Sequence, residues 1–500
     1  MDEEKLEAGV GGDESSEYSA ELAMEQIKLF HDQYKEPYAL IPDAHKSCVK
    51  LSSKQFARWL LHFLLKMTGE AKKISSVIKR LEARALYESP QCDLDVRIVK
   101  RDGFIWYDLG NGKAVRIDKS GWEITSEFPI AFRKLKHQKP QVEPLRSGDI
   151  KELLKFVNIP TGASMTGSQL LFLVSTVFAL MPDHPHPILV LHGPQGSAKT
   201  TAFKILKRLI DPSSMGTLSL SDNQRELVQL ASHHYLLAFD NLTHLSTDQS
   251  DLLCRICTGD GFSKRELYSD DDDVIYSYRR VIGLNGINIT PNKADLLDRS
   301  LIIGFERVEK FETEEAFWER FETAMPRIFG AMLDTLVKAL GKIDSMPEPQ
   351  NLRMADFGKY GCAIAEAIGA TADEFLAAYK ENLDSQNDEA ISASVVGEAM
   401  VGLMKERETW EGTATELLYQ LNTTGYELQI DMKVKSWPKD ARWVWRRIQE
   451  VKTNLEYRGI FVKWHATDSK LITITKTDRY VSNVQNVAPD IMDRMDISLE

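Results

Sequence analysis

The chain has 500 residues, of which 43% are hydrophobic and 27% are charged, and its formal net charge is −12. This length favours about three domains, and the composition is ordinary for a globular chain with sizeable cores. The negative balance excludes a surface that binds polyanions over its whole area, so any contact with nucleic acid must be regional. Five scattered cysteines indicate a reducing compartment and no disulfide framework.

The chain opens on a strongly acidic stretch. Its first 20 residues carry seven acidic side chains and one lysine, so we expect residues 1–20 to be a disordered acidic tail. No signal-peptide pattern is present, and the longest apolar run, Leu170–Met181, is too short to cross a bilayer. We therefore expect a cytoplasmic protein without membrane contact, in which this run forms a buried helix.

Periodicity and turn signals divide the rest of the chain. Apolar residues at helical spacing reach to about residue 90, and a strand-rich patch and a linker over Leu135–Pro144 follow. The predicted order is an α+β domain of unknown role (21–140), a helical lead-in (145–187), an α/β core (188–310), a helical domain (311–408), a compact C-terminal domain (410–477) and a polar tail (478–500).

Two further motifs each have a functional and a structural interpretation. Asp93 and Asp95 alternate as the metal pair of an archaeal-type primase would, but no third carboxylate or histidine motif follows. We therefore favour polar side chains on an antiparallel strand. Cys254 and Cys257 form one C-x-x-C within a helical pattern, and we favour buried cysteines over a metal or redox site.

An apolar run, a glycine-rich turn and a basic amphipathic segment follow one another in ILVLHGPQGSAKTTAFKILKRLIDP (Ile188–Pro212). In such loops, backbone N–H groups and a helix N-terminus hold phosphates, while a lysine reaches the β- and γ-oxygens. The pattern predicts a nucleotide site rather than a chance strand–helix junction. Its expected phosphate cradle is Gly193, Pro194, Gln195, Gly196, Ser197, Ala198, Lys199, Thr200 and Thr201.

Ala198 departs from the usual pattern, because it stands where G-x-x-x-x-G-K-[ST] has its second glycine. An alanine costs least there if the backbone is right-handed, a region that is open to every L-residue. The ending also resembles the AKS or AKT of minichromosome-maintenance helicases, so the substitution is compatible with nucleotide binding.

The segment HHYLLAFDNLTHLS predicts a strand that ends in Asp240. A carboxylate there can hold Mg²⁺ through water next to Thr200. Most hydrolysing proteins with this pattern place a second carboxylate next, which activates the attacking water, and here Asn241 takes its place. An amide orients water but cannot take its proton, so either hydrolysis is slow or a carboxylate from elsewhere completes the site.

Two further residues follow in the same order. The segment RRVIGLNG predicts a strand that ends in Asn285, within reach of a γ-phosphate if the strand lies next to that of Asp240. Arg299 precedes another strand, and an arginine at such a point commonly acts on the nucleotide of a neighbouring subunit. The alternative for Arg299 is an ion pair with Asp295 or Asp298.

Together with CTGDGFSKRELYSDDDDVIYSYRRVIGLNG and DLLDRSLIIGF, these segments make residues 188–307 resemble the ATPase core of superfamily 3 helicases within the AAA+ class. The resemblance is strongest to primase-helicases of phages, plasmids and large DNA viruses. It implies a P-loop core with a parallel sheet and flanking helices, ATP and Mg²⁺ as cofactors, and a homo-oligomer, usually a hexamer. The implied catalytic set is Lys199, Asp240, Asn241, Asn285 and Arg299, with Thr200 and Asp240 on the metal.

The resemblance also implies a hairpin that holds single-stranded DNA in the pore of the ring. It would begin at Lys264 and Arg265. The acidic run Asp270–Asp273 at its tip would repel a phosphate backbone, so we expect a solvated turn there. Any grip on DNA would then fall to Lys264 and Arg265, with Arg279 and Arg280.

The C-terminal part is basic, since residues 431–476 carry eleven Lys and Arg against five Asp and Glu. Thr413 and Glu416 predict a capped helix, and a second, arginine-rich helix and two strands follow. This order resembles a winged-helix module, a common appendix of such primase-helicases, and implies contact with duplex DNA. The alternative is a protein-docking module with a solvated basic face. The candidate phosphate contacts are Arg442, Arg446 and Arg447.

Two functions remain open from the sequence. The first is an ATP-hydrolysing, ring-forming, helicase-like DNA motor that replicates a mobile element or a virus. The second is a nucleotide-switched DNA-binding initiator, regulator or defence sensor, in which Asn241 keeps hydrolysis slow. DNA-stimulated ATP turnover would favour the first, and ATP-dependent assembly with little hydrolysis would favour the second. A third interpretation, a scaffold that binds no nucleotide, predicts that ATP does not stabilise the protein.

Overall fold

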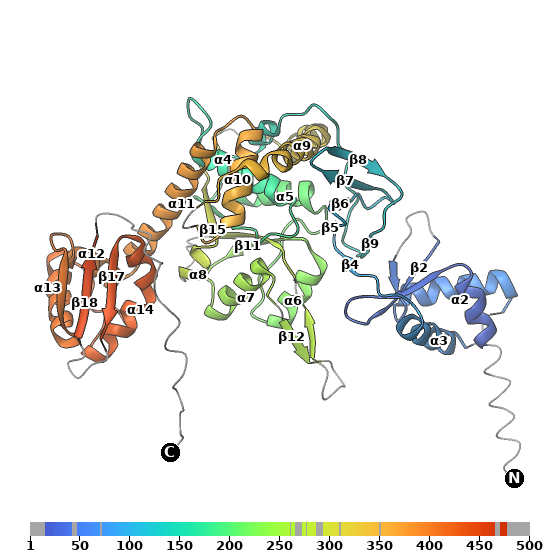
Figure 1. The fold of residues 1–500 in the computed structure, drawn as a ribbon, viewed down its shortest axis with the longest axis horizontal. Helices are drawn as coiled ribbons and strands as arrows, with labels where there is room; N and C mark the ends of the chain where they lie inside the picture. Colours follow the sequence, from blue (N-terminus) through green and yellow to red (C-terminus); the bar gives the residue numbers. More distant parts are fainter. Residues whose placement is uncertain are drawn as a thin grey trace, which may run out of the picture. The chain divides into compact units, whose positions relative to one another are not determined.

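The computed structural model describes residues 16–42, 48–70, 73–260, 262–265, 273–276, 278–286, 294–309, 312–349, 352–465 and 471–477. The chain forms two compact units, and Figure 1 shows their elements along the chain. The first unit takes its residues from 1–289, 299–349 and 354–379, and the second from 290–298, 350–353 and 380–500.

The first unit begins with a small α+β module. A helix occupies residues 16–24, and its Ala20 and Ala23 are fully buried in the core of the module. The predicted disordered tail over 1–20 is therefore too long, because the apolar face of this helix is needed to close the core. The remaining elements are β1 (Lys28–His31), β2 (Pro37–Leu40) and β3 (Cys48–Lys50), which pair antiparallel in this order, and α2 (Lys54–Thr68) and α3 (Ile74–Tyr87).

A four-stranded antiparallel meander follows, as the period-two alternation predicts. The predicted linker Leu135–Pro144 is in fact packed against this meander. The buried amide of Gln141 donates hydrogen bonds to the Tyr107 hydroxyl and to the carbonyl of Leu209, each at 2.8 Å. The strands are β5 (Ile98–Arg101), β6 (Phe104–Asp108), β7 (Ala114–Asp118) and β8 (Gly121–Thr125), flanked by the parallel pair β4 (Leu94–Asp95) and β9 (Ala131–Phe132).

A parallel sheet forms the centre of the first unit, with the strand order β11-β14-β10-β15. Its strands are apolar runs buried along most of their length, as expected where helices cover both faces. An isolated parallel bridge from Leu218 to Phe239 extends the sheet beyond β11. The strands are β10 (Ile188–His192), β11 (Leu236–Leu242), β14 (Val281–Gly286) and β15 (Ser300–Gly304).

Helices pack around this sheet (Figure 1). The apolar run Leu170–Met181 lies mostly in α4 and is buried, which confirms the expected buried helix. α5 follows β10 directly and contacts β11 and β14. The bounds are η1 (Ile150–Phe156), α4 (Gly167–Phe178), α5 (Lys199–Ile210), α6 (Gln224–His233), α7 (Thr247–Thr258), α9 (Glu314–Lys342), η2 (Ile343–Ser345) and α10 (Ala355–Ala367), with the two-stranded hairpin β12 (Phe262–Arg265) and β13 (Asp273–Tyr276).

The predicted helical domain over 311–408 is divided between the two units. α9 and α10 pack on each other and on α4 in the first unit. The boundary falls at residue 380, inside α11 (Ala372–Ala393), and the chain beyond it belongs to the second unit. Helical periodicity shows which face of a helix is apolar but not which core that face joins.

The second unit is built around one apolar core, which the end of α11, three further helices and a sheet share. Its three strands pair antiparallel in the order β16-β18-β17. Thr413 caps α13, and the Glu416 side chain returns to its backbone, as the sequence predicts. The elements are α8 (Ala294–Leu297), α12 (Val395–Leu403), β16 (Thr409–Thr413), α13 (Ala414–Glu427), α14 (Ala441–Tyr457), β17 (Ile460–Trp464) and β18 (Leu471–Lys476).

Candidate nucleotide-binding site

The glycine-rich loop connects the C-terminal end of β10 to the N-terminus of α5. The chain passes so close to Phe305 that a Cβ atom on Gly193 would lie 2.3 Å from the Phe305 carbonyl oxygen. The neighbouring backbone is fixed by a hydrogen bond from Phe305 N–H to the His192 carbonyl, at 2.7 Å. Glycine at position 193 is therefore required by packing, and the loop can curve above the free N–H groups of the helix N-terminus.

Ala198 has a left-handed backbone, with φ 63° and ψ 25°. The favourable case for an alanine, a right-handed backbone, is therefore not met. A left-handed conformation costs an L-residue about 1 kcal/mol or more because its Cβ crowds the following carbonyl. The glycine that is usual at this position has a conformational reason, and Ala198 retains the conformation at some cost in stability.

The Lys199 ammonium lies inside the curve of the loop. Its Nζ donates hydrogen bonds to the carbonyls of Gly193 (2.7 Å) and Pro194 (2.9 Å) and to the Ser197 hydroxyl (3.1 Å). Burial lowers the pKa of Lys199, and the carboxylate of Asp240 opposes this shift. The first helical turn thus holds a cation where a bound phosphate would meet it, as a phosphate cradle requires.

Three oxygen-bearing side chains from three elements meet beside this loop. The Asn285 amide, at the end of β14, donates to Asp240 Oδ1 on β11 at 2.5 Å and lies 3.4 Å from Thr200 Oγ1 on α5. The structure therefore brings together Thr200, Asp240 and Asn285, which lie far apart in the sequence. The carboxyl ends of neighbouring parallel strands lie at the same edge of the sheet, which explains why these three side chains lie together.

One atom of this cluster lacks a partner in the protein. Asn285 Oδ1 is buried, and it accepts no hydrogen bond from the part of the chain that the structure describes. Unsatisfied buried acceptors are rare and commonly point to a bound ion, water or ligand. A hydroxyl, a carboxylate and an amide oxygen at one edge suit the oxygen preference of Mg²⁺, so these residues fit a magnesium-bound phosphate.

Asn241 is exposed and has a left-handed backbone with φ 57°. The register between β11 and β14 is irregular at this point, between Phe239 and Leu242. Asparagine tolerates the left-handed region better than most residues, so local geometry gives a structural reason for Asn241. The same bulge would strain a glutamate at this position.

Asp222, a carboxylate that sequence reasoning missed, shares a cavity with Asp240. Asp240, Asn241, Asp222 and Gln249 line one cavity of about 310 Å³. The buried Gln249 amide donates to Asp222 Oδ1 at 2.9 Å, and its oxygen accepts from Ser246 N–H in a capping box. The capping box is readable in the sequence. The presence of Asp222 in the same cavity as Asp240 cannot be read from the sequence, because the segment that carries Asp222 joins the sheet edge only through the bridge between Leu218 and Phe239.

The structure does not bring Arg299 to this cluster within one chain. Its carbonyl accepts from Ile188 N–H at 2.7 Å, so Arg299 lies at the start of β15, whereas the glycine-rich loop follows the opposite end of β10. The two carboxylates that the sequence offered as its partners, Asp295 and Asp298, both make ion pairs with Arg353. The role of Arg299 on a neighbouring subunit stays a prediction.

The predicted hairpin forms, since β12 and β13 pair antiparallel with Arg265 opposite Asp273. The side chains of Lys264 and Arg265 and the acidic tip over 270–272 lie outside the described residues. Arg279 and Arg280, which the sequence also offered for contact with DNA, instead make hydrogen bonds to backbone carbonyls of the protein. Arg279 donates to the carbonyls of Thr258 and Asp183, and Arg280 donates to the carbonyl of Ala231.

The three arginines of α14 differ in their surroundings. Arg442 is 88% exposed and pairs with Asp440, and Arg446 lies over the exposed Trp443 ring at 5.2 Å. Arg447 pairs with Glu450 at 2.9 Å and donates to the Lys435 carbonyl, so its guanidinium is largely occupied. Arg442 and Arg446 are thus the better candidates for contact with phosphates.

The two remaining motifs have structural explanations. Arg101 lies 3.4 Å from the Asp93 carboxylate and 3.2 Å from that of Asp95. Burial raises the pKa of Asp95 to about 6, and its strand pairs in parallel with β9 rather than antiparallel as expected. Cys254 and Cys257 are buried in α7, and the Cys257 thiol donates to the His186 carbonyl at 2.9 Å. No metal-binding cluster of three or more His, Cys, Asp or Glu occurs among the described residues.

Among the helices that the structure describes, none combines the length and the apolar character that a membrane span needs.

No curated protein matches the sequence. A solved structure of the NrS-1 C-terminal region is 12% identical with a TM-score of 0.42, and the match covers 91% of this chain and 97% of that one. A structure titled as an SCCmec type IV Cch active helicase is 12% identical with a TM-score of 0.41, and the match covers 90% of this chain and 93% of that one.

Two family models match consecutive parts of the sequence. Residues 150–389, which carry the loop and the parallel sheet, match the model of the actinomycete integrative conjugative element replication protein. Residues 396–488 match the model of the RepA C-terminal domain from the same elements. From residue 150 to residue 488, the chain is thus similar, with one short gap, to the replication proteins of actinomycete integrative conjugative elements.

Proposed function

We propose that this chain is an ATP-hydrolysing replication protein that acts as a helicase-like motor on DNA. The observation that carries the proposal is the cluster of Thr200, Asp240 and Asn285 beside the Lys199 ammonium and the glycine-rich loop. The family match supports a role in replicating a mobile element.

Each residue of the cluster has a different role in the proposed phosphoryl transfer. Lys199 would bind the β- and γ-oxygens, and Thr200 and Asp240 would hold Mg²⁺, which would supply positive charge to neutralise the phosphate oxygens. Asn285 orients Asp240 through its hydrogen bond, and its unpartnered oxygen would accept from the water that attacks the γ-phosphate. The backbone N–H groups from Gly193 to Lys199 complete the cradle.

Asp222 is the carboxylate that takes the proton of the attacking water. Asn241 cannot accept that proton, and Asp222 lines the same cavity as Asp240. The buried Gln249 holds one carboxylate oxygen of Asp222 at 2.9 Å, an arrangement in which a base is oriented by a third group. Asp222 is exposed and lines the cavity, so water has access to its carboxylate.

The variant Asp222→Asn tests this assignment. General-base catalysis is worth about 100-fold or more, so kcat for ATP should fall by that amount while affinity for Mg-ATP changes less than about twofold. Asp248→Asn, which removes an exposed carboxylate from the first turn of the same α7, is the matched control. Wild-type turnover in the Asp222 variant would rule out this base.

The motor function needs a ring. We infer that chains assemble as a homo-oligomer, as a hexamer in the AAA+ superfamily 3 manner, in which Arg299 reaches the nucleotide of the neighbouring chain. The hairpin β12–β13, which begins near Lys264 and Arg265, would hold single-stranded DNA in the pore. DNA-stimulated ATP hydrolysis, measured with the wild type and with Lys199→Ala, tests this, because a motor turns over ATP faster on its track.

We infer that the second unit binds duplex DNA as a winged helix. Its order is helix, strand, two helices and two strands, with α12, β16, α13, α14, β17 and β18 sharing one core. The exposed face of α14 carries Arg442, Trp443 and Arg446. Guanidinium groups on one helix face can follow a phosphate backbone.

The geometry of Asn241 favours a second candidate function, a nucleotide-switched initiator that hydrolyses ATP slowly. In that case ATP promotes assembly on DNA, and turnover stays low with or without single-stranded DNA. Light scattering with ATP and a turnover assay separate the two. For the switch, Asn241→Glu should raise turnover, although the left-handed backbone makes this substitution cost about 1 kcal/mol.

A further inference from the structure

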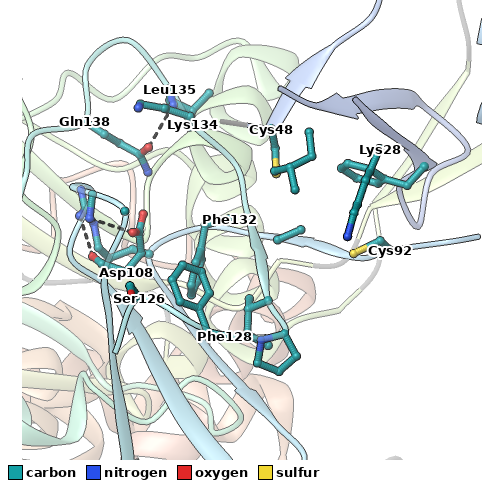
Figure 2. Close-up of a pocket in the computed structure, with 18 of the residues that line it drawn as sticks. Lys28, Cys48, Cys92, Asp108, Ser126, Phe128, Phe132, Lys134, Leu135 and Gln138 are labelled. Atoms are coloured by element: carbon teal, nitrogen blue, oxygen red, sulfur yellow. Dashed lines mark hydrogen bonds between the residues drawn. The ribbon is translucent and has the colours of Figure 1, made fainter. Parts of the chain in front are cut away.

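A second cavity lies far along the sequence from the glycine-rich loop, in the N-terminal third of the chain. Its volume is about 550 Å³, within the range of sites for small organic ligands. The strands of the first module line one side, and the loop that follows the meander, over residues 126–140, lines the other (Figure 2).

One wall is aromatic. The rings of Phe128 and Phe132 lie 6.0 Å apart, and the stacked pair Phe30 and Tyr38 contributes Phe30 to the opposite part of the lining. The planes of the Phe128 and Phe132 rings are tilted by 53°, so a planar ring could stack on one of them and meet the edge of the other. Figure 2 shows Phe128 and Phe132 next to each other among the lining residues.

A polar donor in the lining lacks a partner. Gln138 uses its oxygen to accept from Leu135 N–H at 3.0 Å, and its buried Nε2 has no hydrogen-bond partner in the described part of the chain. Leaving a buried donor unsatisfied costs about 1–3 kcal/mol. Once the Gln138 side chain turns towards the cavity that it lines, an acceptor on a ligand would recover that energy, whereas a purely apolar ligand would not.

The charged residues of the lining are mostly cationic. Lys28, Lys134 and Lys139 are exposed at the cavity, while the one lining carboxylate, Asp108, already accepts from Gly110 N–H at 2.8 Å. An anionic ligand is therefore favoured over a cationic one. The two lining cysteines do not add thiolate chemistry, since Cys48 is packed in an apolar cluster and burial raises the pKa of Cys92.

We propose that this cavity binds a nucleoside phosphate unit, with the base against Phe128 and Phe132 and the phosphate near Lys28 and Lys134. Gln138 would donate to an acceptor on the edge of the base. A free nucleotide and the terminal nucleotide of a single strand share this chemistry. The site is separate from the ATP site at Lys199 and does not depend on it.

The experiment uses full-length Lys199→Ala protein, so that the glycine-rich loop does not compete for phosphate. Calorimetry with thymidine monophosphate and with a five-nucleotide oligothymidylate should detect binding of at least one of them at millimolar concentration or below. Equal affinity for both identifies a free nucleotide as the ligand, and at least tenfold tighter binding of the strand identifies a strand end.

Phe128→Leu and Phe132→Leu keep apolar volume but remove the aromatic face, and together they should weaken binding about tenfold. Lys134→Ala should weaken it further at low salt. The control Lys113→Ala removes a cation that pairs with Glu143 and does not line the cavity. If the phenylalanine variants misfold, Gln138→Leu carries the test, and melting temperatures identify such a failure.

Two results would overturn the proposal. One is the absence of binding of either ligand at millimolar concentration. The other is binding that the Phe128, Phe132, Lys134 and Gln138 variants leave equal to that of the Lys113 variant. Tight binding of a medium-chain fatty acid without binding of a nucleotide would likewise assign the cavity to an apolar ligand.

Discussion

The Asn285 amide donates a hydrogen bond of 2.5 Å to the carboxylate of Asp240, and this contact joins the ends of two neighbouring parallel strands. It orients Asp240 before any ligand arrives. The amide also reaches towards Thr200, so one side chain spans the sheet edge and the helix that follows the loop.

Asn285→Leu keeps the branched shape of the side chain, with a larger volume, and removes both polar atoms. Loss of one preorganised polar group at a reacting centre commonly lowers kcat by about 100-fold. We expect this loss in ATP turnover, with Mg-ATP affinity in calorimetry changed by less than about fivefold, because the loop and Lys199 are untouched. A variant that hydrolyses ATP at the wild-type rate would remove Asn285 from the site.

Ala198→Gly should stabilise the protein. At φ 63° the alanine pays a left-handed penalty that glycine avoids, so the free energy of unfolding should rise by up to about 1 kcal/mol in urea titrations. Ala202→Gly in the right-handed interior of the same helix is the control, and it should lower that free energy by about 1 kcal/mol or more. A loss at both positions would contradict the left-handed assignment.

Acidification from pH 7 to pH 5 should destabilise the first unit through His186. Burial lowers the pKa of His186 to about 3, while the pKa of a histidine in an unfolded chain is near the ordinary value of 6.5. Between these values the unfolded state binds the proton and the folded state does not, so stability falls as the pH falls. The expected loss is about 2 kcal/mol at pH 5 for this histidine.

Urea titrations at both pH values measure this loss. His186→Leu should reduce the difference between them by about 2 kcal/mol. The substitution should also be tolerated at pH 7, because leucine places an apolar side chain in a buried position beside the Phe178 ring, whose centroid lies 5.3 Å from that of His186. Replacement of the exposed His62 by Gln is the control. An unchanged pH dependence in the His186 variant would show that other groups cause the loss.

Arg442→Ala and Arg446→Ala should each weaken duplex DNA binding about equally for all sequences. If each arginine contacts one phosphate, each substitution reduces the slope of log affinity against log salt concentration by about 1. Fluorescence anisotropy over a salt series measures the slope. Arg407→Ala, which removes an exposed arginine bonded to Gln420 elsewhere in the second unit, should leave it unchanged. Equal slopes in all variants would indicate a docking module for protein.

Much of the candidate site could be predicted from local pattern. Gly193, Lys199, Asp240 and Asn285 each stand at the end of an apolar strand or the start of a helix, and such ends meet at one edge of a parallel sheet. Asp222 escaped prediction because its neighbour in space, Gln249, lies 27 residues away and no strand leads to it. The cavity beside Phe128 escaped for the same reason, since its walls come from separate segments.

The glycine-rich loop, the parallel strands, the hairpin and the capped helices could be predicted from the amino-acid sequence, because short-range periodicity, glycine and capping residues specify each of them. The tertiary structure alone decided the left-handed backbone of Ala198, the burial of residues 16–24, the position of the unit boundary inside α11 and the use of Arg279 and Arg280 within the protein. These features depend on which distant surfaces pack together, and a local pattern carries no information about its partner in space.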